Sequence, residues 1–250
     1  MKLSALSIVI LTNRIDDRFQ QALNSSQFAD SVFVVDNCLE KNQESWKVLQ
    51  KKYDFQRIEY SKTITDFSKA RNEALKHIIT PWVLFLDSDE VLSKNAAFEI
   101  QTIIELNRYD AITIQRVDYF LGKPLLYGEA GNTSLVRMFK VKLGKFTRAV
   151  HETVVISGTI GQSNFYISHF SHDSISTFLK KITNYASIES KNRQHSQLQN
   201  SIQLCTYPIA KFIYNYFLKL GFLDGYRGLL YAVLMSLHSF FVRVFYYETK

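Results

Sequence analysis

Four short runs of β-branched and other apolar residues recur along the first part of the chain. They are Ser7–Thr12, Ser31–Asn37, Arg57–Ser61 and Trp82–Asp87, and the stretches between them have a helical period or a helix-forming composition. Strands that alternate with helices predict a parallel sheet covered by helices, so the expected fold class is α/β. In open sheets of this kind ligands bind beyond the carboxyl ends of the strands. The residues to inspect are therefore Thr12-Asn13, Asp36-Asn37 and Asp87-Ser88-Asp89.

The remaining pattern indicates a second half of different character. A helix is predicted from Asp66, which is suited to an N-cap, and it ends before Pro81. Further strands are expected at Ala111–Phe120, Ser134–Lys140, Thr153–Ser157 and Phe165–Phe170, and helices near 174–197, 207–220 and 226–247. We therefore predict one α/β domain over residues 1–170 and a helical C-terminal region over 171–250.

Composition limits the alternatives. A chain of 250 residues, 46% of them hydrophobic, is long enough for one sizeable core and a smaller appendage. The two cysteines, Cys38 and Cys205, form no CxxC pair, which argues against a disulfide scaffold or a structural zinc site and fits a reducing cytosol. The apolar N-terminal run is short and lacks a small-residue cleavage site, so we interpret it as a strand and not as a signal peptide.

The positive charge is concentrated near the C-terminus. Residues 171–250 hold nine basic and four acidic side chains, against 21 and 19 in residues 1–170. This asymmetry indicates a polyanion or an anionic membrane as partner, and a solvated basic face is the alternative. Aromatic residues make up 14% of the chain, and those after Tyr207 lie in long apolar helical stretches. This pattern favours lipid over nucleic acid, for which the chain carries no recognition motif.

One local pattern carries clear chemistry. The apolar run that begins at Trp82 leads directly into Asp87, Ser88, Asp89 and Glu90. Two carboxylates at positions i and i+2 at the end of a strand can hold a hard divalent cation and, through it, a diphosphate. An ordinary acidic loop or a helix cap is the alternative interpretation.

Several motifs together resemble those of a known family. They are Ser7–Asn13, Val34–Asn37, Ser68–Leu75, Phe85–Glu90, Arg137–Phe139, Val150–Glu152 and His169–His172. In order and spacing this set resembles the family 2 inverting glycosyltransferases, and it looks closest to the bacterial lipopolysaccharide-core β-1,4-glucosyltransferase branch. The resemblance covers nearly the whole chain. It implies a GT-A fold, a Rossmann-like and mostly parallel sheet that binds a nucleotide-sugar.

The resemblance also implies a donor site. A nucleoside pocket would be lined by Thr12, Asn13 and Asp36, and the base, ribose or diphosphate would be faced by Arg71 and Asn72. The acidic motif would bind the nucleotide-sugar through Asp87 and Ser88. A divalent metal, Mn²⁺ or Mg²⁺, would be held by Asp87, Asp89 and His169, with His172 as an alternate ligand.

Transfer with inversion requires a base that deprotonates the acceptor hydroxyl. By resemblance the candidate is Glu152, in a Val-His-Glu motif where the family more often has Glu-Asp; Asp118 and Glu129 are the alternatives, and His151 could orient Glu152. The segment Tyr119–Gly128 suits either a mobile loop over the acceptor or a β-hairpin. Arg137 and Lys140 suit either an acceptor phosphate or the surface.

These patterns predict an enzyme that moves a hexose, glucose from UDP-glucose, onto a lipid-linked glycan such as lipopolysaccharide core. Two other functions are considered. A nucleotidyltransferase would usually have a glycine-rich basic loop after its first strand, and Thr12–Ile15 contains no glycine. A non-catalytic, membrane-associated protein that binds nucleotide or sugar would use its carboxylates only to cap loops.

The C-terminal helices predict the location. Lys211, Asn215 and Lys219 recur every four positions on an otherwise apolar helix. The next segment is uncharged only from Gly228 to Val242, and a spanning helix needs roughly twenty apolar residues. We therefore expect a cytoplasmic protein bound peripherally to the inner leaflet. Burial of these helices against the catalytic domain or in a dimer is the alternative.

Overall fold

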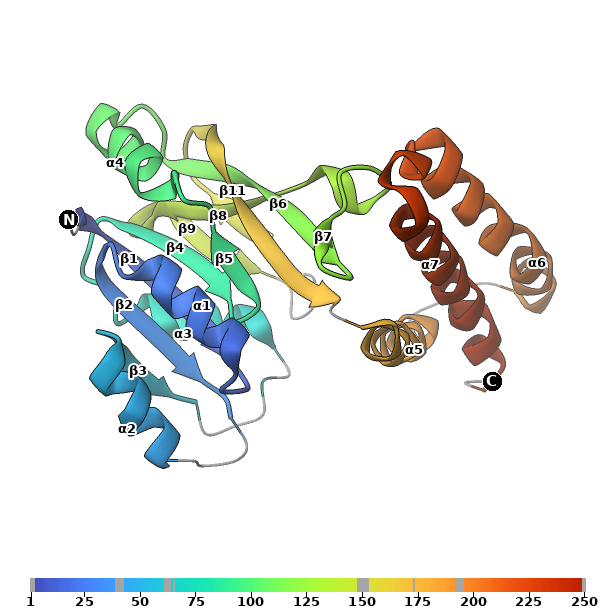
Figure 1. Cartoon of the computed structure of the whole chain (residues 1–250), viewed down its shortest axis with the longest axis horizontal. Helices are drawn as coiled ribbons and strands as arrows, with labels where there is room; N and C mark the ends of the chain where they lie inside the picture. The colour runs from blue at the N-terminus through green and yellow to red at the C-terminus, as the bar shows by residue number, and fades with distance from the viewer. Residues whose placement is uncertain are drawn as a thin grey trace. The chain divides into compact units, whose positions relative to one another are not determined.

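The structure, a computed structural model, describes residues 3–38, 43–60, 64, 66–147, 153–172, 174–191 and 196–248 (Figure 1). The chain divides into two compact units. The first, here called the sheet unit, comprises Met1–Arg116 and Ser134–His169. The second, the helical unit, comprises Val117–Thr133 and Phe170–Lys250. The segment 117–133 thus belongs with the C-terminal helices, a division that the sequence did not indicate.

The sheet unit begins with the predicted alternation of strands and helices. Its elements are β1 (Leu3–Thr12), α1 (Asp17–Ser26), β2 (Ala29–Asp36), α2 (Gln43–Lys52), β3 (Gln56–Glu59), α3 (Phe67–Leu75) and β4 (Trp82–Asp87). β1 pairs in parallel with both β2 and β4, and β2 pairs in parallel with β3. The α/β fold class with a mostly parallel start to the sheet is therefore confirmed.

The later elements extend the sheet with strands of mixed direction. They are β5 (Glu90–Leu92), α4 (Ala96–Leu106), β6 (Ala111–Phe120), β8 (Thr133–Lys140), β9 (Gly144–Thr147), β10 (Thr153–Ile156) and β11 (Ile160–His172). Within the described residues the strand order of the large sheet is β3-β2-β1-β4-β8-β6-β11-β5, while β9 and β10 form a separate pair. β8 is antiparallel to β4, and β5 is antiparallel to β11. The short strands β5 and β9 were not predicted.

The apolar run of β1 is buried on both faces of the sheet. Ile8 and Ile10 belong to a core cluster that includes Phe19 of α1 and Trp46 of α2. Val9 belongs to a second cluster, which includes two alanines of α3, Ala70 and Ala74. Burial on both faces explains why this strand is a continuous apolar run without alternation.

The start of α3 is also as predicted, because the Asp66 carboxylate accepts a hydrogen bond from Lys69 N at 3.0 Å. The helix ends at Leu75, several residues before Pro81.

Within its described residues, the helical unit contains three long helices. They are α5 (Ile175–Lys191), α6 (Gln197–Ile213) and α7 (Gly225–Phe245). A π-helical turn, η3 (Tyr214–Leu218), and a 3₁₀ turn, η4 (Gly221–Asp224), connect α6 to α7, and η5 (Tyr246–Glu248) follows α7. α6 begins well before the predicted residue 207. Its start is a capping box in which Ser196 and Gln199 each bond the other's backbone, and the helix continues through Pro208.

The segment 117–133 enters this unit as a hairpin. β7 (Lys123–Pro124) pairs with the end of β6, and Leu121 and Gly122 at the turn have φ of 48° and 76°. Two central residues with positive φ are typical of a two-residue hairpin turn. The hairpin interpretation of Tyr119–Gly128 is thus confirmed. The short 3₁₀ turn η1 (Ala130–Asn132) follows.

Among the described residues, one helical stretch is long and apolar enough to cross a membrane. It is Gly221–Glu248, and 39% of its most apolar window is buried. By length and composition this stretch could cross a membrane, whereas the fifteen uncharged residues from Gly228 to Val242 predicted a helix too short to do so.

Candidate active site

The carboxyl ends of three parallel strands lie side by side. In the sheet register Thr12 stands opposite Asp36, and Leu11 stands opposite Asp87. The ladder continues one step beyond the strands, because Asn37 N donates to Thr12 O at 2.8 Å and Ser88 N donates to Leu11 O at 3.1 Å. The polar residues that follow β1, β2 and β4 are therefore gathered at one edge of the sheet, as the α/β pattern predicted.

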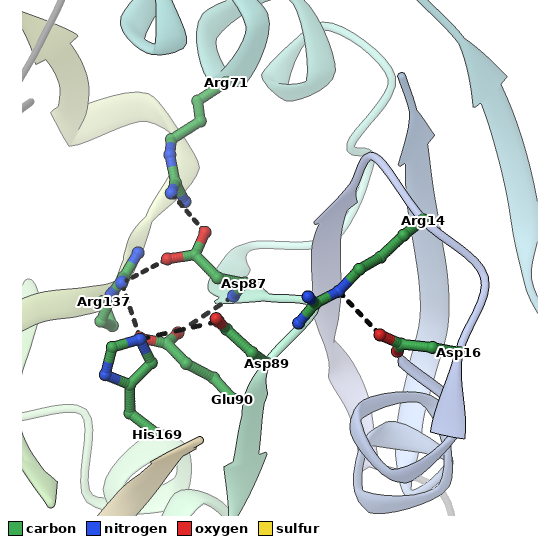
Figure 2. A network of polar contacts seen from close by, with 8 residues as sticks. All are labelled: Arg14, Asp16, Arg71, Asp87, Asp89, Glu90, Arg137 and His169. Atoms are coloured by element: carbon green, nitrogen blue, oxygen red, sulfur yellow. Dashed lines mark hydrogen bonds and ion pairs between the residues drawn. The ribbon is translucent and has the colours of Figure 1, made fainter. Parts of the chain in front are cut away.

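Asp87 is held between two arginines (Figure 2). Arg71 Nη2 donates to one carboxylate oxygen at 2.7 Å, and Arg137 Nη2 donates to the other at 2.9 Å. The arginine side chains are only 2% and 10% exposed, whereas that of Asp87 is 35% exposed. Two charge-assisted hydrogen bonds from different elements fix the orientation of this carboxylate.

Glu90 is bonded to the same loop and to Arg137. Its side chain is fully buried and accepts a hydrogen bond from Arg137 at 2.9 Å and another from the backbone N of Asp87 at 3.0 Å. Because one guanidinium nitrogen bonds both acids, Arg137 couples the position of Asp87 to that of Glu90. The acidic loop is therefore anchored at its first and last residues.

The two anchored acids have pKa values displaced in opposite directions. Burial by itself would raise the pKa of Asp87, but the positive charges of Arg71 and Arg137 outweigh it and hold the pKa well below its usual range. Burial raises the pKa of Glu90, the Asp87 carboxylate raises it further, and Arg137 only partly opposes this. Asp87 is consequently an anion throughout the neutral range.

His169 reaches this loop from a distant part of the sequence. β11 pairs with β5 so that His169 stands directly opposite Glu90. This register places His169 Nε2 at 3.7 Å from an oxygen of Asp89 (Figure 2). The sequence suggested that His169 joins the acidic motif, and the structure does bring the two together.

The three predicted metal ligands, Asp87, Asp89 and His169, have different surroundings. Among the residues that the structure describes, no group of three His, Cys, Asp or Glu side chains is arranged to hold a metal ion. Both oxygens of Asp87 contact arginines, so its role as a ligand stays a prediction. Asp89 and His169 lie 3.7 Å apart, and carboxylate oxygen and imidazole nitrogen are donor types that a divalent ion such as Mn²⁺ accepts. Their role as metal ligands stays a prediction.

Asp36 is also paired within the protein. Arg57 of β3 donates to one of its oxygens from Nε at 2.9 Å and from Nη2 at 2.6 Å, and Cys38 N donates to the other oxygen at 2.8 Å. The Arg57 guanidinium also lies over the Trp46 ring, 4.6 Å from its centre. Sequence reasoning missed Arg57, whose only signal was a cation within a short strand. Asp36 is therefore part of an ion pair and not an isolated carboxylate, and its contact with a nucleoside stays a prediction.

The loop after β1 contains the other two predicted nucleoside contacts. Thr12 is buried, and its hydroxyl donates to Arg14 O at 2.5 Å and accepts from Arg14 N at 3.2 Å. Asn13 is exposed. Arg14 forms an ion pair with Asp16 at 2.8 Å. Thr12 thus shapes the turn and leaves Asn13 accessible, while contact of either residue with a nucleoside stays a prediction.

Arg71 and Asn72 have roles inside the fold. The Arg71 guanidinium lies 5.6 Å from the centre of the Phe85 ring and 5.5 Å from that of Phe146. The Asn72 amide donates to Phe146 O at 2.9 Å and accepts from Phe146 N at 3.0 Å. Together they fasten β9 to α3. Their predicted contact with base, ribose or diphosphate is untested, and the structure gives each a role in positioning.

The remaining candidates divide into described and undescribed residues. Glu152 and His151 lie outside the described residues, and the side chain of His172 is likewise not described. Ser88 is nearly buried in the loop between Asp87 and Asp89. Arg137 is neither a surface residue nor an exposed phosphate ligand, because it is buried between Asp87 and Glu90. Lys140 pairs with Asp110 at 2.9 Å.

The two alternative bases lie in the helical unit. Asp118 is buried, and Glu129 pairs with Lys211. The assignment of the base to Glu152 stays a prediction.

Comparison with known proteins adds the family. The model of the family described as glycosyl transferase family 2 matches residues 8–181. An uncharacterized glycosyltransferase of Rickettsia prowazekii is 26% identical over 94% of this chain and 84% of its own length, and one of Rickettsia typhi is 25% identical over the same shares. Among solved structures, S. aureus TarS matches 89% of this chain and 45% of its own length, with 16% identity and a TM-score of 0.49. The chain thus spans less than half of that protein.

Proposed function

Because the chain belongs to glycosyl transferase family 2, we propose that it transfers a hexose, glucose from UDP-glucose, to a lipid-linked glycan. The proposed acceptor is a saccharide such as lipopolysaccharide core, presented at the cytoplasmic face of the membrane. The transfer inverts the configuration at the anomeric carbon. Membership of family 2 follows from the match to residues 8–181, and we propose the sugar, the acceptor, the inversion and the location.

The arrangement around Asp87 is the observation that supports the proposal most directly. Two arginines and a buried glutamate fix the loop, so that Asp89 and His169 are presented together at the edge where three parallel strands end. The carboxyl ends of the strands are where an open α/β sheet binds its ligand. A loop that only capped a strand would not require two nearly buried arginines.

The reaction itself asks little covalent chemistry of the protein. The acceptor hydroxyl oxygen forms a bond to the anomeric carbon, its proton passes to a base, and the bond from that carbon to the diphosphate oxygen breaks so that UDP leaves. Glu152 is the proposed base, by resemblance. A divalent cation held by Asp89 and His169 would neutralise charge on the leaving diphosphate. Arg71, Arg137 and Glu90 keep the loop in the geometry that this requires.

The test is a donor screen on the purified full chain. Nucleotide release is measured with UDP-glucose, UDP-GlcNAc, UDP-galactose and GDP-mannose, each with Mn²⁺, with Mg²⁺ and with EDTA. We expect UDP release to be fastest from UDP-glucose and to fall in EDTA. Release only from another donor would correct the sugar. If no donor is cleaved and none shifts the melting temperature, the enzymatic proposal fails.

A further inference from the structure

Helix α6 lies with its polar stripe turned into the helical unit. Lys211 pairs with Glu129, and Asn215, one turn later, is 1% exposed and accepts a hydrogen bond from Glu129 N at 2.9 Å. Lys219 continues the stripe, and its backbone O accepts from Gly128 N at 2.9 Å. Lys211 and Asn215, which would face water on an ordinary amphipathic helix, therefore contact Glu129 instead, while the side chain of Lys219 is exposed.

The opposite side of α6 and η3 is apolar and exposed. Ile209 is 62% exposed, Ile213 44%, Phe217 53% and Leu218 71%. A helix on a water-covered surface shows the reverse arrangement, with its apolar stripe against the core. Polar groups inside and large apolar groups outside suit a helix whose surroundings are themselves apolar.

The connection from α6 to α7 enlarges this exposed face into what we call the apolar tip. Its exposed members are Phe217, Leu218, Leu220, Phe222, Leu223 and Tyr226, joined by Leu126 from the hairpin segment. The two segments are tied together by Asp224, whose carboxylate accepts from Leu126 N at 3.1 Å and from Tyr127 N at 2.9 Å. The apolar tip is therefore built from both parts of the unit and is not a loose loop.

Two basic side chains, Lys219 and Arg227, lie beside the apolar tip. The two nearby acids are engaged, since Asp224 accepts backbone N–H groups and Glu129 pairs with Lys211. Lys219 is exposed, with its ammonium 5.5 Å from the centre of the Tyr214 ring, and Arg227 lies 4.5 Å from that of Tyr226. Aromatic rings with long basic side chains beside an apolar surface are typical of proteins at a membrane interface. Basic groups near an anionic leaflet strengthen binding further.

We propose that the apolar tip inserts into the headgroup and upper acyl region of an anionic phospholipid leaflet. The exposed Lys219 would contact lipid phosphates while Leu218, Phe222 and Leu223 enter the apolar layer. This inference rests on the proposed membrane location and deepens it, because it assigns the contact to a defined surface. Within the polar stripe, Lys219 is on the side that would meet lipid headgroups, whereas Lys211 and Asn215 contact Glu129 inside the unit.

Flotation with vesicles tests the proposal. The full chain is mixed with vesicles of phosphatidylcholine and phosphatidylglycerol in equal parts, or of phosphatidylcholine alone. We expect flotation with the anionic vesicles. The triple variant Leu218→Asn, Phe222→Asn, Leu223→Asn should bind at least about a hundredfold more weakly, because each large apolar side chain contributes roughly tenfold. Lys219→Gln should weaken binding about fivefold.

The matched control is Ile79→Asn with Phe98→Asn in the sheet unit. These side chains are 91% and 72% exposed, so the control removes comparable exposed apolar surface elsewhere. Its flotation should equal that of the wild type. A wild type that does not float, or a triple variant that floats as well as the wild type, overturns the proposal. So does a wild-type dimer that the triple variant converts to monomers without any flotation, because the occupant would then be a second copy.

A reporter experiment covers the case in which the triple variant does not fold. Leu218→Cys in a Cys205→Ser background is labelled with an environment-sensitive dye, and Cys205→Ser alone serves as the blank for Cys38. We expect a blue shift of emission on anionic vesicles, and its absence contradicts insertion. UDP release from soluble donor is measured in parallel. Flotation without release would refute the proposed function alone, and release without flotation would refute the apolar tip alone.

Discussion

The two units bury polar side chains in contrasting ways. In the sheet unit, Arg71, Arg137 and Glu90 converge on Asp87 at a sheet edge, and the large apolar residues lie inside two core clusters. In the helical unit, Asn215 is buried and Lys211 is half-buried along one helix face, while Phe217 and Leu218 are exposed. Inward-facing polar side chains therefore do not by themselves identify a reactive site.

The polar networks of the two units differ in the groups at which they end. The ion network of the sheet unit ends in a carboxylate that is 35% exposed, beside the Asp89–His169 pair. The polar contacts of α6 end in backbone groups of the segment 128–129. We therefore propose that the sheet unit carries out the chemistry and that the helical unit determines the location of the protein.

The largest effect is expected for the proposed base. Glu152→Gln should lower turnover by about 10² to 10⁴, because an amide cannot accept the proton of the acceptor hydroxyl. Donor affinity, measured by thermal shift with UDP-glucose, and flotation should stay unchanged. Asp118→Asn and Glu129→Gln are the matched controls. If one of these abolishes turnover while Glu152→Gln does not, the base lies in the helical unit and the division of roles is wrong.

A slightly smaller effect is expected at the acidic loop. Asp89→Asn should lower the rate of UDP release by about 10² to 10³ and raise the Mn²⁺ concentration needed for half-maximal rate, since the amide keeps the shape of the side chain but loses its charge. The exposed acid Glu105→Gln on α4 is the control. Near-normal release from the purified Asp89→Asn protein would remove Asp89 from the cation site.

Local sequence patterns were sufficient to predict the part of the site that lies at the ends of individual strands. The runs at β1, β2 and β4 and the cap at Asp66 specify where Thr12, Asp36 and Asp87 emerge. The position of His169 depends on β5, which has only three residues and thus no periodic signal. It was inferred from resemblance alone, and the β5–β11 register supplies the physical reason.

Local sequence patterns could not predict which distant segments pair with one another. Arg57 and Arg137 meet their carboxylates only because β3 and β8 join the sheet in particular registers. The spacing of Lys211, Asn215 and Lys219 revealed a polar stripe, but spacing does not say which face of a helix is covered. That face is determined here by Glu129, which is far from α6 in the sequence.

Breaking one ion pair in each unit compares the two networks directly. Arg137→Met should cost about 3 to 5 kcal/mol of unfolding free energy, because it leaves the buried Glu90 and the Asp87 carboxylate without a shared cation. Lys211→Met should cost about 1 kcal/mol or less, since its side chain and that of Glu129 are 30% and 28% exposed. Equal losses would show that the two networks do not differ.

The measurement can resolve the units, because both tryptophans, Trp46 and Trp82, lie in the sheet unit. Urea unfolding followed by tryptophan fluorescence reports the sheet unit, and far-UV circular dichroism reports the helices as well. Arg137→Met should shift the fluorescence transition, and Lys211→Met should leave it in place.

The two cysteines, one in each unit, provide a smaller contrast. Burial, followed by the hydrogen bond and negative charge of Asp36, raises the pKa of the Cys38 thiol to about 12. Cys205 is exposed on α6. With iodoacetamide at pH 8, Cys38 should react at least about tenfold more slowly than Cys205, because the thiolate is the reactive form. Peptide mass spectrometry measures both rates, and urea-unfolded protein, in which they should converge, is the control. Equal rates in the native protein would contradict the buried Asp36 environment.

The smallest effect is expected at Asp110, a more exposed acid of the sheet unit. Its contribution to the free energy of unfolding can be compared with that of the buried network around Asp87. The Thr159 N–H, the Lys140 ammonium and the Thr159 hydroxyl all bond Asp110 and lower its pKa to about 2. In the unfolded chain the pKa is about 3.9, so the stabilisation is complete above that pH and is lost as the pH falls toward 2. Asp110→Asn should therefore be less stable than the wild type at pH 6 and equal to it near pH 2. Urea midpoints across this range, with Asp30→Asn as control, measure the difference. A gap that persists unchanged at pH 2 would mean that the carboxylate's charge is not what joins Asp110 to Thr159 and Lys140.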